Sequence, residues 1–143
     1  MMKSKIVVGI GAKDYQPLLD WATDEAARWD FDLLIVHCIK GRLSTEMPYS
    51  NDEQQQQGLS TLNNAIEFSR SKGLVAASVL CEGFAGEVLV QCASEAKQLV
   101  VGAVCKARFR HVLDTSITKY CVHHASCPLT IVPLSHELGT AEF

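Results

Sequence analysis

The chain has 143 residues, a formal net charge of −3, 48% hydrophobic residues and 20% charged residues. This length and balance suit one globular domain with one core, and the acidic charge argues against a binder of nucleic acid or anionic membranes. Because no apolar run is long enough to span a membrane, we expect a cytoplasmic protein without nucleic-acid or membrane partners.

The first third of the chain alternates apolar strands with a helix. The β-branched run at 5–10 predicts a central strand buried on both faces, and it lacks the long apolar core and cleavage site of a signal peptide. Residues 32–39 predict a second strand, and 41–52 a polar surface loop. Between the two strands, four residues recur at helical spacing and predict a helix: Leu18, Ala22, Ala26 and Trp29.

The middle of the chain repeats this alternation. A helix is predicted from about 52 to 72, with Gly73 as its C-terminal stop, and a third strand covers 75–81. An apolar stripe marks the core face of that helix: Leu59, Leu62, Ala65, Ile66 and Phe68. The next helix is marked by another set: Ala85, Val88, Leu89, Cys92 and Ala96.

The remaining chain predicts a fourth strand at 98–104 and a last helix from Thr115 or Ser116 to about residue 125. A fifth strand is expected between Pro128 and Pro133. The alternating order predicts one α/β domain, doubly wound, with a mostly parallel sheet and helices on both faces. We expect residues 1–134 to form the domain and 135–143 a flexible tail.

Six cysteines would allow a disulfide framework in a short secreted chain. Most of them occur inside apolar patterns, so we interpret them as reduced, buried thiols that act as small hydrophobic residues. The six are Cys38, Cys81, Cys92, Cys105, Cys121 and Cys127.

A ligand site is expected beyond the carboxyl ends of the strands, where the strand order reverses. Two turns should flank it, at 9–13 and 102–116. The second turn ends at a helix N-terminus, which favours an anion, and Lys106, Arg108 and Arg110 add positive charge nearby. The alternative interpretation is a strand end, an ordinary N-cap and a solvated basic face.

Nearly the whole chain resembles the universal stress protein family. The resemblance covers residues 6–132 and includes "IVVGI", "WATDEAARWDFDLLIVHCI", "EGFAGEVLVQCASEAKQLVVGA" and "HHASCPLTIVP". It implies a five-stranded parallel sheet of order 3-2-1-4-5, a role in the stress response and a homodimer. The family commonly dimerises through the last strand, which implies an interface near Leu129, Ile131 and Val132.

Members of the family that bind ATP resemble the pattern G-x-x-G, nine residues, then G followed by Ser or Thr. In this chain the pattern begins at Gly102 and ends at Ser116, but Cys105 and Thr115 replace the other two glycines. The family's Asp after the first strand, in a "VGVDGS"-like run, is replaced here by Gly11, and its Ser by Lys13.

These departures weaken the expected nucleotide site. Phosphate-binding glycines permit positive φ and close backbone approach, whereas Thr115 and Cys105 carry a Cβ. We therefore expect no tight ATP binding and no required cofactor; the alternative is weak binding of ATP, AMP or a small anion in an altered pose. The residues of this vestigial site are Gly9, Gly11, Lys13, Gly102, Cys105, Lys106, Arg108, Thr115 and Ser116.

The sequence shows no clear catalytic motif, which favours a binding module with an unknown protein partner over an enzyme. The chain has no G-x-S-x-G elbow and no local Cys–His signature, although Cys105 beside basic residues is a candidate reactive thiol. The spacing C-x-H-H-x₂-C at 121–127 differs from zinc sites, so we interpret it as fortuitous. His37 is interpreted as a core or edge histidine with a hydrogen-bonded ring.

Overall fold

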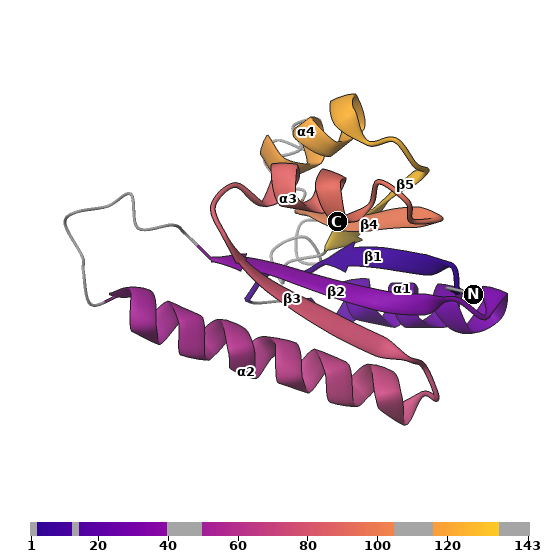
Figure 1. The fold of residues 1–143 in the computed structure, drawn as a ribbon, viewed down its shortest axis with the longest axis horizontal. Coiled ribbons are helices and arrows are strands. Elements are labelled where there is room, and N and C mark those ends of the chain that lie inside the picture. Colours follow the sequence, from indigo (N-terminus) through magenta and orange to yellow (C-terminus); the bar gives the residue numbers. More distant parts are fainter. Residues whose placement is uncertain (1–2, 13–14, 40–49, 105–115, 135–143) are drawn as a thin grey trace, which may run out of the picture.

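The computed structural model describes residues 3–12, 15–39, 50–104 and 116–134 (Figure 1). Strands and helices alternate along the chain, as the sequence predicts. In chain order the elements are β1 (Lys5–Gly9), α1 (Gln16–Trp29), β2 (Asp32–Ile39), α2 (Ser50–Ser71), β3 (Ala76–Glu82), α3 (Ala85–Cys92), β4 (Gln98–Val104), α4 (Ser116–His124) and β5 (Leu129–Leu134).

All five strands form one parallel sheet in the order β3-β2-β1-β4-β5. The predicted order 3-2-1-4-5 is therefore confirmed. β1 occupies the centre, where Ile6, Val7 and Val8 have no exposed surface. A continuous run of β-branched residues suits this position because both faces of a central parallel strand are covered by helices.

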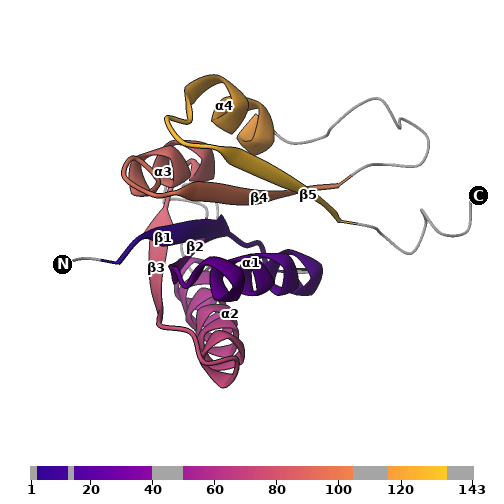
Figure 2. The same ribbon diagram turned by 90° about the vertical axis from the view of Figure 1, so that its right-hand side faces the viewer.

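The helices form one layer on each face of the sheet, as the edge-on view shows (Figure 2). α1 and α2 cover one face, where Leu19, Ile35 and Leu62 belong to the same buried cluster. α3 and α4 cover the other face, where Leu89 and Cys121 pack against Val36 and Val101. Because strand residues alternate between faces, each strand supplies both clusters.

Helix α1 has the predicted start, and three of its four predicted core residues, Leu18, Ala22 and Ala26, are buried. Pro17 lies in its first turn, where the missing N–H costs no helical hydrogen bond. The helix ends at Trp29, and the C-cap residue Asp30 adopts the left-handed conformation at φ 57°. Trp29 was expected on the core face, but its side chain is 58% exposed, and Leu19 and Thr23 are buried instead. The core face is therefore wider than predicted on the side of Leu19 and Thr23, and it excludes Trp29.

Helix α2 begins two residues earlier than predicted and ends beside Gly73, which has φ +83° and confirms the predicted stop. Leu59 was assigned to the core stripe but is 47% exposed. Gly58 faces the sheet in its place, and a Cβ there would lie 2.8 Å from a methyl group of Leu80. Glycine at this position thus lets the helix approach β3 closely, which an apolar stripe does not reveal.

Three further boundaries differ from the predictions. Strand β3 begins at Ala76, and Val75 before it is 65% exposed. Helix α3 ends at Cys92, so Ala96 is buried in the core from the connection and not from the helix. β5 includes Pro133, which was expected to end it; an edge strand tolerates proline because one row of its backbone groups has no ladder partner. Residues 135–143, the predicted tail, lie outside the described residues.

None of the helices described here is long and apolar enough to cross a membrane.

The two leucines of opposite burial provide a test of this packing. Leu19 has no exposed surface in α1, whereas Leu59 in α2 is 47% exposed. We expect Leu19→Ala to lower the free energy of unfolding by about 2–5 kcal/mol because it removes buried methyl groups and leaves a cavity. The control Leu59→Ala should change it by about 0.5 kcal/mol or less. Urea denaturation followed by circular dichroism measures both, and equal losses would contradict the assigned helix faces.

Candidate ligand cavity at the strand carboxyl ends

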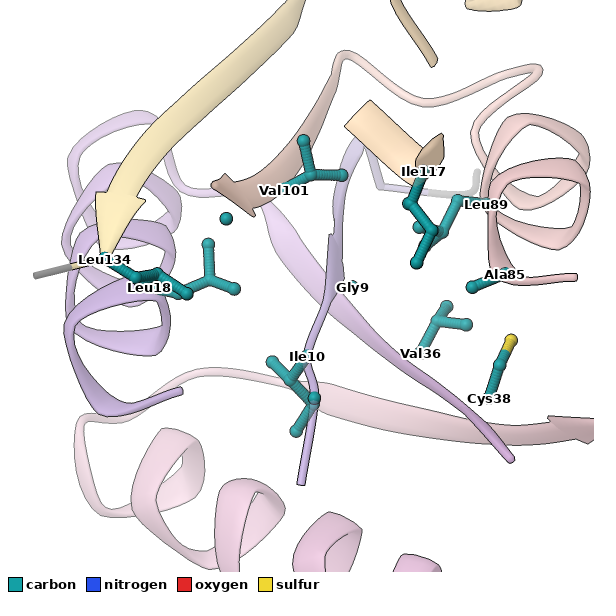
Figure 3. A pocket seen from close by; sticks show the side chains of 12 residues that line it. Gly9, Ile10, Leu18, Val36, Cys38, Ala85, Leu89, Val101, Ile117 and Leu134 are labelled. Carbon is teal, nitrogen blue, oxygen red and sulfur yellow. The ribbon is translucent and has the colours of Figure 1, made fainter. Parts of the chain in front are cut away.

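The strand order reverses between β1 and β4, and a cavity of about 290 Å³ lies at this point (Figure 3). Open parallel sheets place their ligand sites beyond the carboxyl ends of the strands at such a reversal. The volume is at the lower end of the range for small-molecule pockets. The described lining consists of Gly9, Ile10, Gly11, Leu18, Val36, Cys38, Ala85, Leu89, Val101, Gly102, Ile117 and Leu134.

Two leucines cover two of the three glycines that line this cavity. A Cβ on Gly9 would lie 2.8 Å from both terminal methyl groups of Leu89, and one on Gly102 would lie 2.7 Å from a methyl group of Leu134. Real Cβ atoms do not approach other carbons so closely, because interiors are packed at van der Waals distance. The space that these glycines leave open is thus filled by leucine side chains, which also line the cavity.

The described lining carries no charge at neutral pH. Its only ionisable side chain is that of Cys38. Burial, with smaller contributions from the nearby Cys81 and Cys92 thiols, raises the pKa of the Cys38 thiol to about 11. The thiol is therefore neutral at pH 7. Nothing in this part of the lining offers the positive charge that a phosphate group favours.

His37 ties the first turn to the second strand. Its Nδ1–H donates to the carbonyl oxygen of Ile10 at 2.8 Å, and the side chain is only 6% exposed. The backbone N–H of Ile10 also donates to the carbonyl oxygen of Val36 at 2.9 Å. Since a carbonyl oxygen only accepts, the proton must be on Nδ1. The interpretation of His37 as a core histidine with a hydrogen-bonded ring is confirmed.

The start of α4 lies beside the end of β4. Ile117, in the first turn of α4, lines the cavity. The hydroxyl of Thr118 lies 3.5 Å from the carbonyl oxygen of Gly102, to which it donates. The sequence predicted a helix start at Thr115 or Ser116, and the helix begins at Ser116. The helix N-terminus is therefore near the strand end, as the phosphate-loop pattern requires.

The predicted site residues divide into two groups. Gly9, Gly11 and Gly102 line one cavity, and Ser116 begins the adjacent helix. The others lie outside the described residues: Lys13, Cys105, Lys106, Arg108 and Thr115.

Sequence reasoning did not assign Leu18, Leu89, Ile117 or Leu134 to the site. All four are apolar, and an apolar pattern predicts that a residue is buried without showing whether it lines a cavity. Leu134 has one additional signal, because it follows directly after Pro133 at the carboxyl end of the last strand. The parallel pairing of β4 with β5 places it opposite Val104.

The cluster at 121–127 is divided between the interior and the surface. Cys121 is fully buried, whereas His123 and His124 are exposed. Burial raises the pKa of the Cys121 thiol, with a smaller contribution from Cys127. Within the described ranges, no group of three or more His, Cys, Asp or Glu side chains is arranged to hold a metal ion.

Comparisons with known proteins identify the family and the fold. The model of the Universal stress protein family matches residues 2–133 of this chain. No curated protein matches this chain.

The solved structures that this chain resembles include universal stress proteins. One from Archaeoglobus fulgidus is 20% identical to this chain, with a TM-score of 0.75. The match covers 92% of this chain and 95% of the Archaeoglobus chain. Another, from the same organism and in complex with dAMP, is 21% identical, with a TM-score of 0.71. That match covers 92% of this chain and 99% of the solved chain. A family member from Arabidopsis thaliana with AMP bound is 20% identical with a TM-score of 0.67, with 91% of each chain covered.

The His37 contact yields a prediction with a matched control. His37→Leu should lower the free energy of unfolding by about 1–3 kcal/mol, because the buried carbonyl of Ile10 loses its side-chain donor. The same change at the exposed His123 should leave the stability within about 0.5 kcal/mol of the parent chain. Chemical denaturation of the three proteins at one pH makes the comparison. If His37→Leu left the free energy of unfolding unchanged, the hydrogen bond would not be needed to position the first turn.

Proposed function

The chain belongs to the universal stress protein family, and on that premise we propose that it is a binding or regulatory module of the stress response. It acts as a cytoplasmic homodimer and does not bind ATP tightly. A small anion or nucleotide and an unidentified protein are its candidate partners. Nothing in this role requires catalysis by the chain.

One observation carries the proposal against tight ATP binding. The space beside Gly9 and Gly102, two glycines that line the cavity, is filled by Leu89 and Leu134. A phosphate group in this cavity would lie beside these leucines and would meet no charged side chain in the described lining. Burying an anion in apolar surroundings without such partners is costly.

The sequence supports the same conclusion independently. ATP-binding members of the family carry an Asp at this turn, and Gly11 stands at the matching position here. A carboxylate acceptor for the nucleoside is therefore missing. Gly11 lines the cavity and is itself exposed, which leaves room for a longer side chain. Cys105 and Thr115 replace two glycines of the phosphate loop, and each adds a Cβ at a position where the pattern requires none.

The second candidate is a nucleotide-binding protein with an altered phosphate loop. It is supported by the solved relatives in complex with dAMP and with AMP, whose fold this chain shares, and by the position of the α4 start beside the cavity. Its binding residues would be Gly9, Gly11, Gly102, Lys106, Arg108, Thr115 and Ser116.

The proposal of a homodimer rests on β5. This strand forms one edge of the sheet, and an uncovered edge presents unpaired backbone groups that favour association with another strand. Leu129, Ile131 and Val132 are all partly exposed in the single chain. A second copy related by two-fold symmetry would cover the apolar side chains and the edge together.

Calorimetric titration with millimolar ATP and magnesium tests the first part. We expect no saturable heat from the natural chain. The triple variant Gly11→Asp, Cys105→Gly and Thr115→Gly should instead give a saturable heat with a Kd at or below about 1 mM, because it regains an acceptor and two backbone approaches. In the matched control, Ala12→Asp replaces Gly11→Asp and places the carboxylate at the neighbouring exposed residue. Saturable binding by the natural chain would favour the second candidate.

Light scattering after size-exclusion chromatography tests the dimer. The natural chain, with a monomer mass of 15.7 kDa, should elute with twice that mass. Ile131→Arg should shift it to the monomer mass because a charge enters the apolar edge, whereas Val122→Arg, at a 58% exposed residue of α4, should not. Circular dichroism verifies that both variants fold. A monomeric natural chain at micromolar concentration would exclude the proposed dimer.

A further inference from the structure

Three cysteines from separate elements come together on the α3 side of the sheet. Cys38 belongs to β2, Cys81 to β3 and Cys92 to α3. All three are partly exposed. The pKa of Cys38 responds to both other thiols, and that of Cys92 responds to Cys81, so the three thiols lie within electrostatic reach of one another.

Two of the three are also direct neighbours in the sheet. Cys38 and Cys81 are register partners in the parallel β2–β3 pair. Residues at matching register in neighbouring strands project from the same face, and such strands lie about 4.7–4.9 Å apart. Cα atoms joined by a disulfide lie about 4.4–6.8 Å apart, so this register permits a bond without moving the strands. A side-chain hydrogen bond between the Cys38 and Cys81 thiols indicates that they also face each other.

From this geometry we propose that Cys38 and Cys81 are an oxidisable pair that hydrogen peroxide converts to a disulfide between β2 and β3. β3 is the outermost strand at this side of the sheet, so a small oxidant reaches Cys81 from the edge. The inference does not depend on whether the cavity binds a nucleotide.

The reaction proceeds in two balanced steps. The Cys81 thiolate attacks one oxygen of the peroxide, the O–O bond breaks, and the departing hydroxide takes up a proton to become water. Cys81 is then a sulfenic acid. The sulfur of Cys38 attacks the sulfur of Cys81, the S–O bond breaks, and a second water leaves. Two thiols are oxidised to one disulfide, and one peroxide is reduced to two waters.

The order of the two cysteines follows from their surroundings. Burial raises the pKa of Cys38 to about 11, so this residue is a neutral thiol at pH 7 and is a poor initial nucleophile. Cys81 on the edge strand is therefore assigned the first step. Because the thiolate fraction of Cys38 grows with pH throughout the range below its pKa, closure of the disulfide should accelerate as the pH rises.

The disulfide would act on the candidate ligand cavity. Cys38 lines that cavity, and its sulfur lies beside Ala85 at the rim (Figure 3). Bonding to Cys81 draws this sulfur toward β3 and fixes the carboxyl ends of two strands to each other. Oxidation and occupation of the cavity should therefore influence each other, as two linked equilibria must. In a reducing compartment such a bond is transient, which suits a sensor.

Mass spectrometry after treatment of the intact protein with hydrogen peroxide tests the pair. Free thiols are alkylated under denaturing conditions before digestion. Trypsin releases Cys38 in peptide 29–40, but it leaves Cys81 and Cys92 together in peptide 73–97. A second cleavage after Glu82 separates these two. We expect a Cys38–Cys81 linkage that dithiothreitol reverses and that forms faster at pH 9 than at pH 7.

Single serine variants separate the roles. Cys38→Ser should leave Cys81 as a sulfenic acid that dimedone labels, and Cys81→Ser should abolish the linkage. Cys92→Ser, which removes the third thiol of the cluster, should retain the Cys38–Cys81 linkage, and so should Cys127→Ser. Circular dichroism establishes that each variant folds. A dominant bond to Cys92, or fully alkylated Cys38 and Cys81 after peroxide treatment at both pH values, would overturn the proposal.

Discussion

Burial of β1 between two helical layers is the constraint on which the rest of this protein depends. Ile6, Val7 and Val8 have no exposed surface, so consecutive residues of one short strand supply both hydrophobic clusters. A strand in this position must have a parallel neighbour on each side, and right-handed crossovers then place α1 and α2 on one face and α3 and α4 on the other. The reversal of strand order at β1 and β4 creates the cavity as a consequence of this arrangement.

Apolar packing continues from the core to the rim of the cavity. In a phosphate site, glycines leave the backbone open for a ligand. Here Leu89 and Leu134 occupy the space beside Gly9 and Gly102, and the thiol of Cys38 is neutral at pH 7. Glycine thus has a different physical role here from its role in a phosphate site. At these positions it permits close packing of a leucine side chain. The fold keeps the family's topology, and the described part of the lining is apolar and uncharged at neutral pH.

The cysteines illustrate how sheet register can give residues a chemical relationship that their sequence positions do not show. Each of Cys38, Cys81 and Cys92 occurs in an apolar pattern and is adequately explained there as a small hydrophobic residue. Pairing of β2 with β3 places two of them opposite each other, 43 positions apart in the chain. Their partial exposure separates them from Cys121, which is fully buried.

The sequence alone determined the class of fold and the order of the elements, and it predicted the two turns whose glycines line the cavity. Continuous β-branched runs, amphipathic periods and Gly73 are local signals, because they follow from backbone conformation and the burial of one face. Trp29 and Leu59 were misassigned because helical periodicity specifies a face only to within one or two positions, and neighbouring elements decide which residue is covered. Only the tertiary structure decided that Leu134 lies against Gly102, that His37 bonds to Ile10 and that Cys38 faces Cys81. These contacts join residues 27 to 43 positions apart, and their geometry depends on strand register and side-chain packing, which no local pattern encodes.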